Sequence, residues 1–228
     1  MQRDEQLTVY NQFLLESTIG AEYAQLLQHP VPGVYVLPSD ASSLIWYGLM
    51  FIRVGIYQNA IFKFTLSIPR NYPDGGCPDF DFQSGVFHPL VDYVTGQLDT
   101  RSEFQKWRRD INHIHNLLMY ARNIFHTIDT THAVNQEAAR LYRHDFEKYK
   151  RRVQDSIEAC RQEALNPDPS DVHGIRTGEW QTAVMRAARE QIFEPELKAD
   201  SESGSSAQTS GMSWVKAGTY EPFSKEDA

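Results

Sequence analysis

Cysteine is scarce in this sequence of 228 residues, which contains only Cys77 and Cys160. Two thiols in a chain of this length favour a reducing compartment over a disulfide framework. Long apolar runs are also missing, since the longest, 44–52, is half the ~18 residues that a membrane span needs, and the charged first residues do not predict a secretory leader. We therefore expect a soluble, cytoplasmic protein.

An excess of positive charge is likewise missing. Lys and Arg number 22 against 30 Asp and Glu, which gives a net charge of -8. Nucleic-acid-binding domains normally carry a basic excess or stripe, so a nucleic-acid partner is not expected. The 41% hydrophobic content, with twelve Phe and eleven Tyr, is enough to form a core for one domain with additional segments.

The periodicity of apolar residues predicts an α+β domain over residues 7–165. A first helix is expected to bury Ile19, Tyr23, Leu26 and Leu27 on one face, with Ser17 as its N-cap, and to end at 29–33. Alternating aromatic and β-branched residues predict an antiparallel meander with strands at 33–38, 44–53, 60–69 and 79–82. A buried helix follows at 110–128, and then one long helix or a pair of helices at 133–165.

The composition changes after the predicted domain. We expect a linker and one further helix over 166–199, a flexible low-complexity spacer over 200–211, and an aromatic tail over 212–228. The tail contains Trp214, Tyr220 and Phe223, residue types that often anchor protein interfaces. We interpret these three as partner-binding residues that dock either on the domain itself or on another chain.

The stretch "VFHPLVDYVTGQLDT", residues 86–100, lies in an aperiodic loop of the kind that is often functional. Together with "FKFTLSIPRNYPDGGCPDFDF" before it and "AVNQEAARLYRHDFEKY" after it, this loop resembles the ubiquitin-conjugating (E2) enzymes in order and spacing. The resemblance covers roughly 10–160 and implies the E2 fold. It also implies that His88, Pro89 and Leu90 stand where the enzymes have His-Pro-Asn.

The same resemblance implies that the catalytic site is degenerate. The enzymes carry Gly-x-(Ile/Val)-Cys, whereas this chain has Gly96-Gln97-Leu98-Asp99. A thiolate must accept ubiquitin as a thioester, and a carboxylate would give a hydrolysis-prone anhydride instead. Loss of the asparagine removes a donor worth ~2.7–4 kcal/mol in the transition state of such reactions. We expect no catalytic residue here, with His88 as a structural residue and neither cysteine replacing the missing one.

Among inactive E2 variants, the sequence most resembles the Fused Toes (FTS) family, to which the AKT-interacting and Crossbronx proteins belong. The resemblance rests on "IWYGLMF", "FHPLVDYVTGQLD", "FQKWRRDINHIHNLLMYARNIF" and "GMSWVKAGTYEPFS". It implies an adaptor that binds Hook-type coiled-coil proteins and FHIP-type proteins and links vesicles to dynein, promoting endosome clustering. An AKT-type kinase is a further partner that the resemblance implies. The alternative is a ubiquitin- or E2-binding cofactor that contacts its partner through the sheet face.

Other patterns support weaker hypotheses. His113 and His115 lie two positions apart on a helix and therefore point in different directions, and no Cys/His cluster has zinc spacing, so neither a metal site nor a cofactor is expected. His88 with Ser84 or Ser102 lacks the sequence context of a hydrolase nucleophile. The basic residues at 148–152 form either a solvated face, paired through Arg151 with Glu147 and Asp155, or a partner or anionic-membrane contact.

Overall fold

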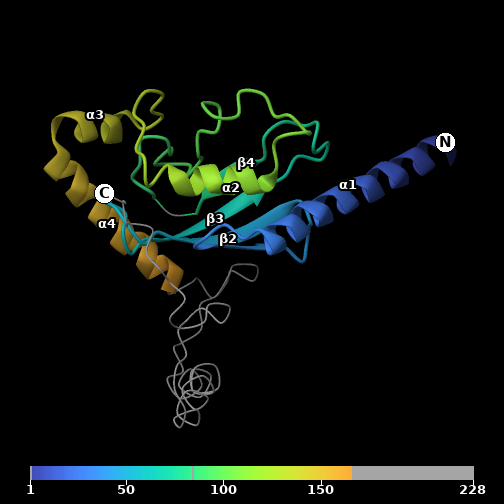
Figure 1. The fold of residues 1–228 in the computed structure, drawn as a ribbon, viewed down its shortest axis with the longest axis horizontal. Helices are drawn as coiled ribbons and strands as arrows, with labels where there is room; N and C mark the ends of the chain where they lie inside the picture. The colour runs from blue at the N-terminus through green and yellow to red at the C-terminus, as the bar shows by residue number, and fades with distance from the viewer. Residues whose placement is uncertain (1, 84, 166–228) are drawn as a thin grey trace, which may run out of the picture. The chain divides into compact units, whose positions relative to one another are not determined.

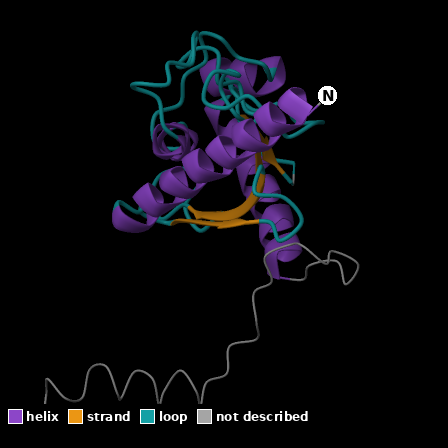
Figure 2. Cartoon of the chain, turned by 90° about the vertical axis from the view of Figure 1, so that its right-hand side faces the viewer, coloured by secondary structure: helices purple, strands orange, loops and turns teal. Residues whose placement is uncertain are grey.

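Four antiparallel strands form one sheet in chain order: β1 (Val34–Pro38), β2 (Ile45–Phe51), β3 (Ile61–Ser67) and β4 (Asp79–Phe82). The structure is a computed structural model that describes residues 2–83 and 85–165 (Figure 1). The predicted meander is confirmed, and each observed strand lies within the predicted range. Helices α1 and α2 lie on the same side of this sheet (Figure 2), which gives the expected α+β arrangement.

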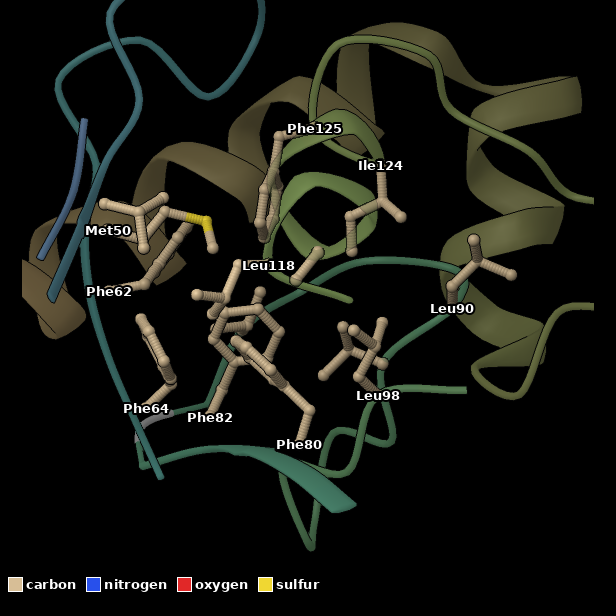
Figure 3. Packing of buried hydrophobic residues seen from close by; sticks show 14 of the residues in the cluster. Met50, Phe62, Phe64, Phe80, Phe82, Leu90, Leu98, Leu118, Ile124 and Phe125 are labelled. Carbon is tan, nitrogen blue, oxygen red and sulfur yellow. The ribbon is translucent and has the colours of Figure 1, made fainter. Parts of the chain in front are cut away.

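The inner face of the sheet is aromatic. Phe62, Phe64 and Leu66 of β3 are fully buried, as their two-residue spacing predicts. The Phe64 and Phe80 rings stack with their centroids 4.5 Å apart, and Phe62 stacks on Phe125 at 4.8 Å (Figure 3). Because Phe125 follows α2, this stacking fixes the end of that helix over the sheet.

Helix α1 (Gln2–Gln28) is longer than the sequence pattern predicts. Ser17 is not its N-cap, because residues 2–16 contain neither proline nor glycine and the helix continues through them. Ile19 and Leu26 are buried as predicted, but Leu27 is 67% exposed. Each residue turns the helix by about 100°, so Leu27 points well away from the direction of Leu26. The N-terminal half of α1 extends past the sheet and α2 (Figure 1).

Helix α2 (Ile114–Asn123) is shorter than the predicted 110–128. Its start is fixed by a tertiary contact, since the Glu22 carboxylate of α1 accepts a hydrogen bond from the Ile114 N–H at 3.0 Å. The Asn116 side chain accepts one from the His113 N–H at 2.9 Å. Ile111, which the periodicity places on the buried face, is therefore outside the helix and half exposed. Trp107, which precedes this segment, is buried.

The segment 133–165 forms a pair of helices, α3 (Gln136–His144) and α4 (Phe146–Leu165). Asn135 caps α3, accepting from the Ala138 N–H at 3.0 Å. Asp145 breaks the run, because its backbone leaves the helical conformation while its carboxylate accepts from the Lys148 N–H at 3.1 Å. Helix α4 packs against β3 and α3. The segments predicted beyond residue 165 lie outside the described residues.

Candidate functional site

The loop after β4 folds back along that strand. The Phe82 N–H donates to the Gly96 carbonyl at 2.9 Å, and bridges join Asp81 with Gln97 and Val91 with Leu98. Gly96 has φ +78°, and a Cβ there would overlap the Phe82 carbonyl oxygen, so the close approach of the two segments requires glycine. The loop that the sequence pattern left aperiodic is therefore tightly placed.

His88 lies fully buried at the centre of this loop. Its Nδ1 accepts from the Leu90 N–H at 3.0 Å, so the neutral ring carries its proton on Nε2 and donates it to the Ile124 carbonyl, also at 3.0 Å. Burial lowers the pKa of His88 to about 3. Both ring nitrogens are occupied by backbone groups, which leaves neither available to Ser102 or to an external substrate. Ser84 is outside the described residues.

Backbone contacts hold the rest of the loop on several sides. The Pro89 carbonyl accepts from the N–H groups of Val134 and Asn135 at 2.9 and 3.0 Å, which joins the loop to the start of α3. The Ser156 hydroxyl of α4 accepts from the Phe87 N–H at 3.1 Å. The Tyr57 hydroxyl donates to the Phe87 carbonyl at 2.7 Å. The loop is thereby a rigid part of the domain.

Leu90 points into the core. Its side chain is 3% exposed and belongs to the main apolar cluster, where it lies near Ile124 and Leu98 (Figure 3). Its carbonyl accepts from the Asp99 N–H at 2.8 Å, so the backbones of these two sequence-predicted positions are in direct contact. A buried leucine at this position offers no hydrogen-bond donor to a reacting group.

Asp99 is tied to its own turn. Its carboxylate accepts from the backbone N–H and the Nε of Arg101, both at 3.2 Å, and its side chain is 9% exposed against 88% for Arg101. Its carbonyl accepts from the Tyr120 hydroxyl at 2.9 Å, which also lies 3.1 Å from the Ser102 hydroxyl. Neither ring nitrogen of His88 is within this network. The carboxylate thus has the role of a turn-forming residue with an exposed cation beside it.

Cys77 lies closer to this turn than the sequence order indicates. Its thiol, half-buried in the loop before β4, is hydrogen-bonded to the Thr100 side chain. Burial raises the pKa of Cys77 to about 11, although the bond with Thr100 acts in the opposite direction. A thiol with this pKa is protonated near neutral pH and is a poor nucleophile. Cys160 is buried on α4.

Comparisons with known proteins agree with this geometry. The ubiquitin-conjugating enzyme family model matches residues 18–157, more than half of the chain. AKT-interacting protein from Rattus norvegicus is 45% identical over 219 residues, which cover 96% of this chain and 75% of the relative. The Homo sapiens protein is 44% identical over the same shares, and the AKTIP homolog of Nematostella vectensis is 43% identical over 98% and 75%.

The chain belongs to the AKT-interacting protein family. This is the Fused Toes family of E2 variants that its sequence resembles, and the expected membership is confirmed. Within residues 2–83 and 85–165, no helix is long and apolar enough to cross a membrane. Trp214, Tyr220 and Phe223, the predicted partner-binding residues, lie outside the described residues.

The basic residues of α4 have other partners than helical spacing predicts. Lys150, rather than Arg151, pairs with Glu147 at 3.0 Å. Arg152, whose side chain is 42% exposed, has its guanidinium 5.1 Å from the centre of the Phe87 ring and 3.8 Å from Glu137. The basic residues at 148–152 are thus partly used within the domain. Helical periodicity alone does not reveal these contacts, because Glu137 belongs to α3.

An apolar groove of about 630 Å³ lies between α1 and β1, and none of its lining residues belongs to the turn at Asp99. Tyr23 and Leu26 of α1 and Leu118 of α2 line it together with β1. Strand β1 is the free edge of the sheet, but Val36 accepts from the Tyr23 hydroxyl at 3.5 Å and the Val34 N–H donates to Val31 at 3.0 Å. Pro38 has no N–H. These features limit the addition of another strand at this edge.

Proposed function

We propose that this chain is a non-catalytic E2 variant that acts as an adaptor. The observation that carries the proposal is the pair formed by Asp99 and Leu90, which stand where the resemblance to E2 enzymes implies cysteine and asparagine. A carboxylate bonded to Arg101 and a leucine in the core supply neither a thiolate nor an oxyanion donor. The buried neutral His88 and the protonated Cys77 do not replace them.

We further propose that the adaptor joins Hook-type and FHIP-type proteins in a complex that links endosomes or other vesicles to dynein. This part rests on the resemblance to the Fused Toes family. The name of the relatives states that they interact with AKT, and an AKT-type kinase is therefore a further proposed partner. The proposed location is cytoplasmic, with peripheral or partner-mediated attachment to endosomal or plasma membranes. We assign partner anchoring to the aromatic residues Trp214, Tyr220 and Phe223.

The test is affinity capture from cytosol with the full chain as bait, followed by mass spectrometry. We expect Hook and FHIP proteins to be recovered from the wild type. A variant with Trp214, Tyr220 and Phe223 changed to alanine should recover less of them at equal thermal stability. Capture of neither protein would contradict the adaptor assignment. Equal recovery by the variant would contradict only the role of the tail.

A second candidate function is a ubiquitin- or E2-binding cofactor. It is favoured by the outer face of the sheet, where the alternation along β1 exposes Tyr35 and Leu37 on the side opposite the core. Tyr35 packs edge-on against Phe51 at 5.7 Å, which extends the apolar surface onto β2. Labelled ubiquitin titrated against the full chain tests this alternative. Chemical-shift changes that are lost in Tyr35→Ala would favour it over the adaptor role.

A further inference from the structure

Positive charge gathers at one corner of the domain, although the chain as a whole is acidic. Residues 140–152, which run from α3 into α4, contain six Lys and Arg against two Asp and Glu, a local charge of +4 in a chain of -8. This corner lies at the end of the domain opposite the N-terminus of α1 (Figure 1). Because salt screens charges beyond about 8 Å, a surface that meets the corner responds to the local charge rather than to the net charge.

Three of these cations are free to meet a partner. Arg140, Lys148 and Arg151 are exposed, and none of them forms an ion pair with another residue that the structure describes. Helical spacing offers Arg151 the carboxylates of Glu147 and Asp155, but neither lies within ion-pair distance of it. The paired, solvated face that this spacing predicts is therefore not what α4 presents.

The free cations of the two helices lie next to one another. Helices α3 and α4 pack together, and Glu137 near the start of α3 lies 3.8 Å from Arg152 of α4. The chain thus turns back on itself at Asp145, and positions at similar distances from this residue lie across from each other. Arg140 is five residues before the turn and Arg151 six residues after it, so the two exposed guanidinium groups belong to neighbouring turns of adjacent helices.

An exposed aromatic ring lies at the same corner. Phe146 is the first residue of α4 and is 41% exposed. Its ring packs edge-on against Tyr142 at 5.7 Å, and the Lys150 ammonium lies 4.8 Å from its centre. Aromatic rings among cations are typical of segments that bind the interface of a bilayer, where anionic headgroups cover apolar chains. A bilayer offers both kinds of contact at once, whereas an acidic protein segment offers only the charge.

We propose that the corner between α3 and α4 binds the surface of an anionic lipid bilayer. The basic corner, as we call it, consists of Arg140, Lys148 and Arg151, which contact headgroups, and Phe146, which enters the interface. Each Lys or Arg near such a surface raises the affinity by a factor of about five, and three together by about a hundredfold. The inference rests on the peripheral membrane attachment in the proposed function and assigns the surface that makes it.

The first test is co-sedimentation of the full chain with vesicles of phosphatidylcholine that contain about 30% phosphatidylserine. We expect binding that weakens as salt is raised and that is absent on vesicles of phosphatidylcholine alone. The test variant replaces the three cations of the basic corner: Arg140→Gln, Lys148→Gln and Arg151→Gln. It should bind at least about thirtyfold more weakly at equal thermal stability.

The matched control makes the same change in net charge at exposed cations on other segments: Arg53→Gln, Arg70→Gln and Lys106→Gln. It should bind the vesicles as the wild type does. Equal weakening by the two variants would show that net charge decides the binding and would overturn the proposal. Binding that neither variant changes would place the membrane contact elsewhere, so that the basic corner falls while peripheral attachment stands.

Absence of binding to either kind of vesicle would also overturn the proposal. Attachment through partners would then remain, and the affinity capture described above tests it separately. Binding of poly-glutamate by the basic corner, without binding to vesicles, would assign the corner to an acidic protein segment and would reject the lipid surface.

The second test locates the contact with an environment-sensitive dye on a single cysteine in a Cys77→Ser background. Glu147→Cys places the dye beside Phe146, at a side chain that is 74% exposed. Its emission should shift to shorter wavelength when vesicles with phosphatidylserine are added. Leu27→Cys, at a 67% exposed position on α1, is the control and should not shift. A shift at Leu27→Cys without one at Glu147→Cys would contradict the proposed orientation.

Discussion

Leu90→Asn should destabilise the domain, although it restores the residue type that the resemblance to E2 enzymes implies. The Leu90 side chain is 3% exposed within the apolar cluster, so its removal forfeits about 1.5–3 kcal/mol of burial. An amide at this place would lie in the apolar cluster that includes Leu98 and Ile124, and an unsatisfied polar group costs about 1–3 kcal/mol more. We therefore expect a loss of about 3–5 kcal/mol and a fall in Tm of roughly 10 °C.

The assay is urea unfolding followed by tryptophan fluorescence, with Leu37→Asn as the matched control. Leu37 is 54% exposed on the outer face of β1, so the same chemical change there should cost less than about 1 kcal/mol. Equal unfolding midpoints for the two variants would refute the conclusion that position 90 has become part of the core. It would then be a site that still accepts a polar side chain.

Three further predictions concern the residues that fix the site. Gly96→Ala should unfold at lower urea than Gly76→Ala, because both glycines have positive φ (78° and 97°) but only a Cβ at residue 96 meets backbone; equal midpoints would contradict this. Glu22→Gln should lose about 1–3 kcal/mol on urea unfolding, because the carboxylate accepts from Tyr72, His113 and the start of α2; unchanged stability would show that the charge is not needed. Because the pKa of His88 falls from 6.5 to about 3 on folding, the unfolded chain takes up a proton first as pH drops. Its contribution to stability should thus decline between pH 6.5 and 3, by about 2–3 kcal/mol at pH 4.5. Ring resonances of folded His88 that titrate near 6.5 would disprove the assignment.

The fold was predictable from local patterns because strands such as β3 bury alternate residues, and that signal survives in the sequence. The helix boundaries were less predictable. Helix α1 begins at Gln2, far ahead of Ile19, so the buried periodicity starting at Ile19 does not mark the beginning of α1. The start of α2 depends on Glu22, 92 residues earlier in the chain, a tertiary contact that no local pattern contains.

The candidate site divides in the same way. The absence of cysteine at position 99 and the asparagine replaced by Leu90 are visible in the sequence once the motifs are aligned. The surroundings of these two residues are not visible in the sequence. The bond from Arg101 to Asp99, the two backbone partners of His88 and the contact between Cys77 and Thr100 all depend on how the loop folds back along β4. Only Gly96 is a local indication that the loop folds back, because the positive φ of that position favours glycine.

The most direct test of the central claim is a ubiquitin-charging assay. The full chain is incubated with activating enzyme, ATP and ubiquitin beside an active E2 enzyme, and products are separated with and without reducing agent. We expect no adduct on this chain while the control enzyme is fully charged. A reductant-sensitive adduct that disappears in Cys77→Ser, or a hydroxylamine-sensitive adduct that disappears in Asp99→Asn, would show that the chain still accepts ubiquitin and would contradict its assignment as a non-catalytic variant.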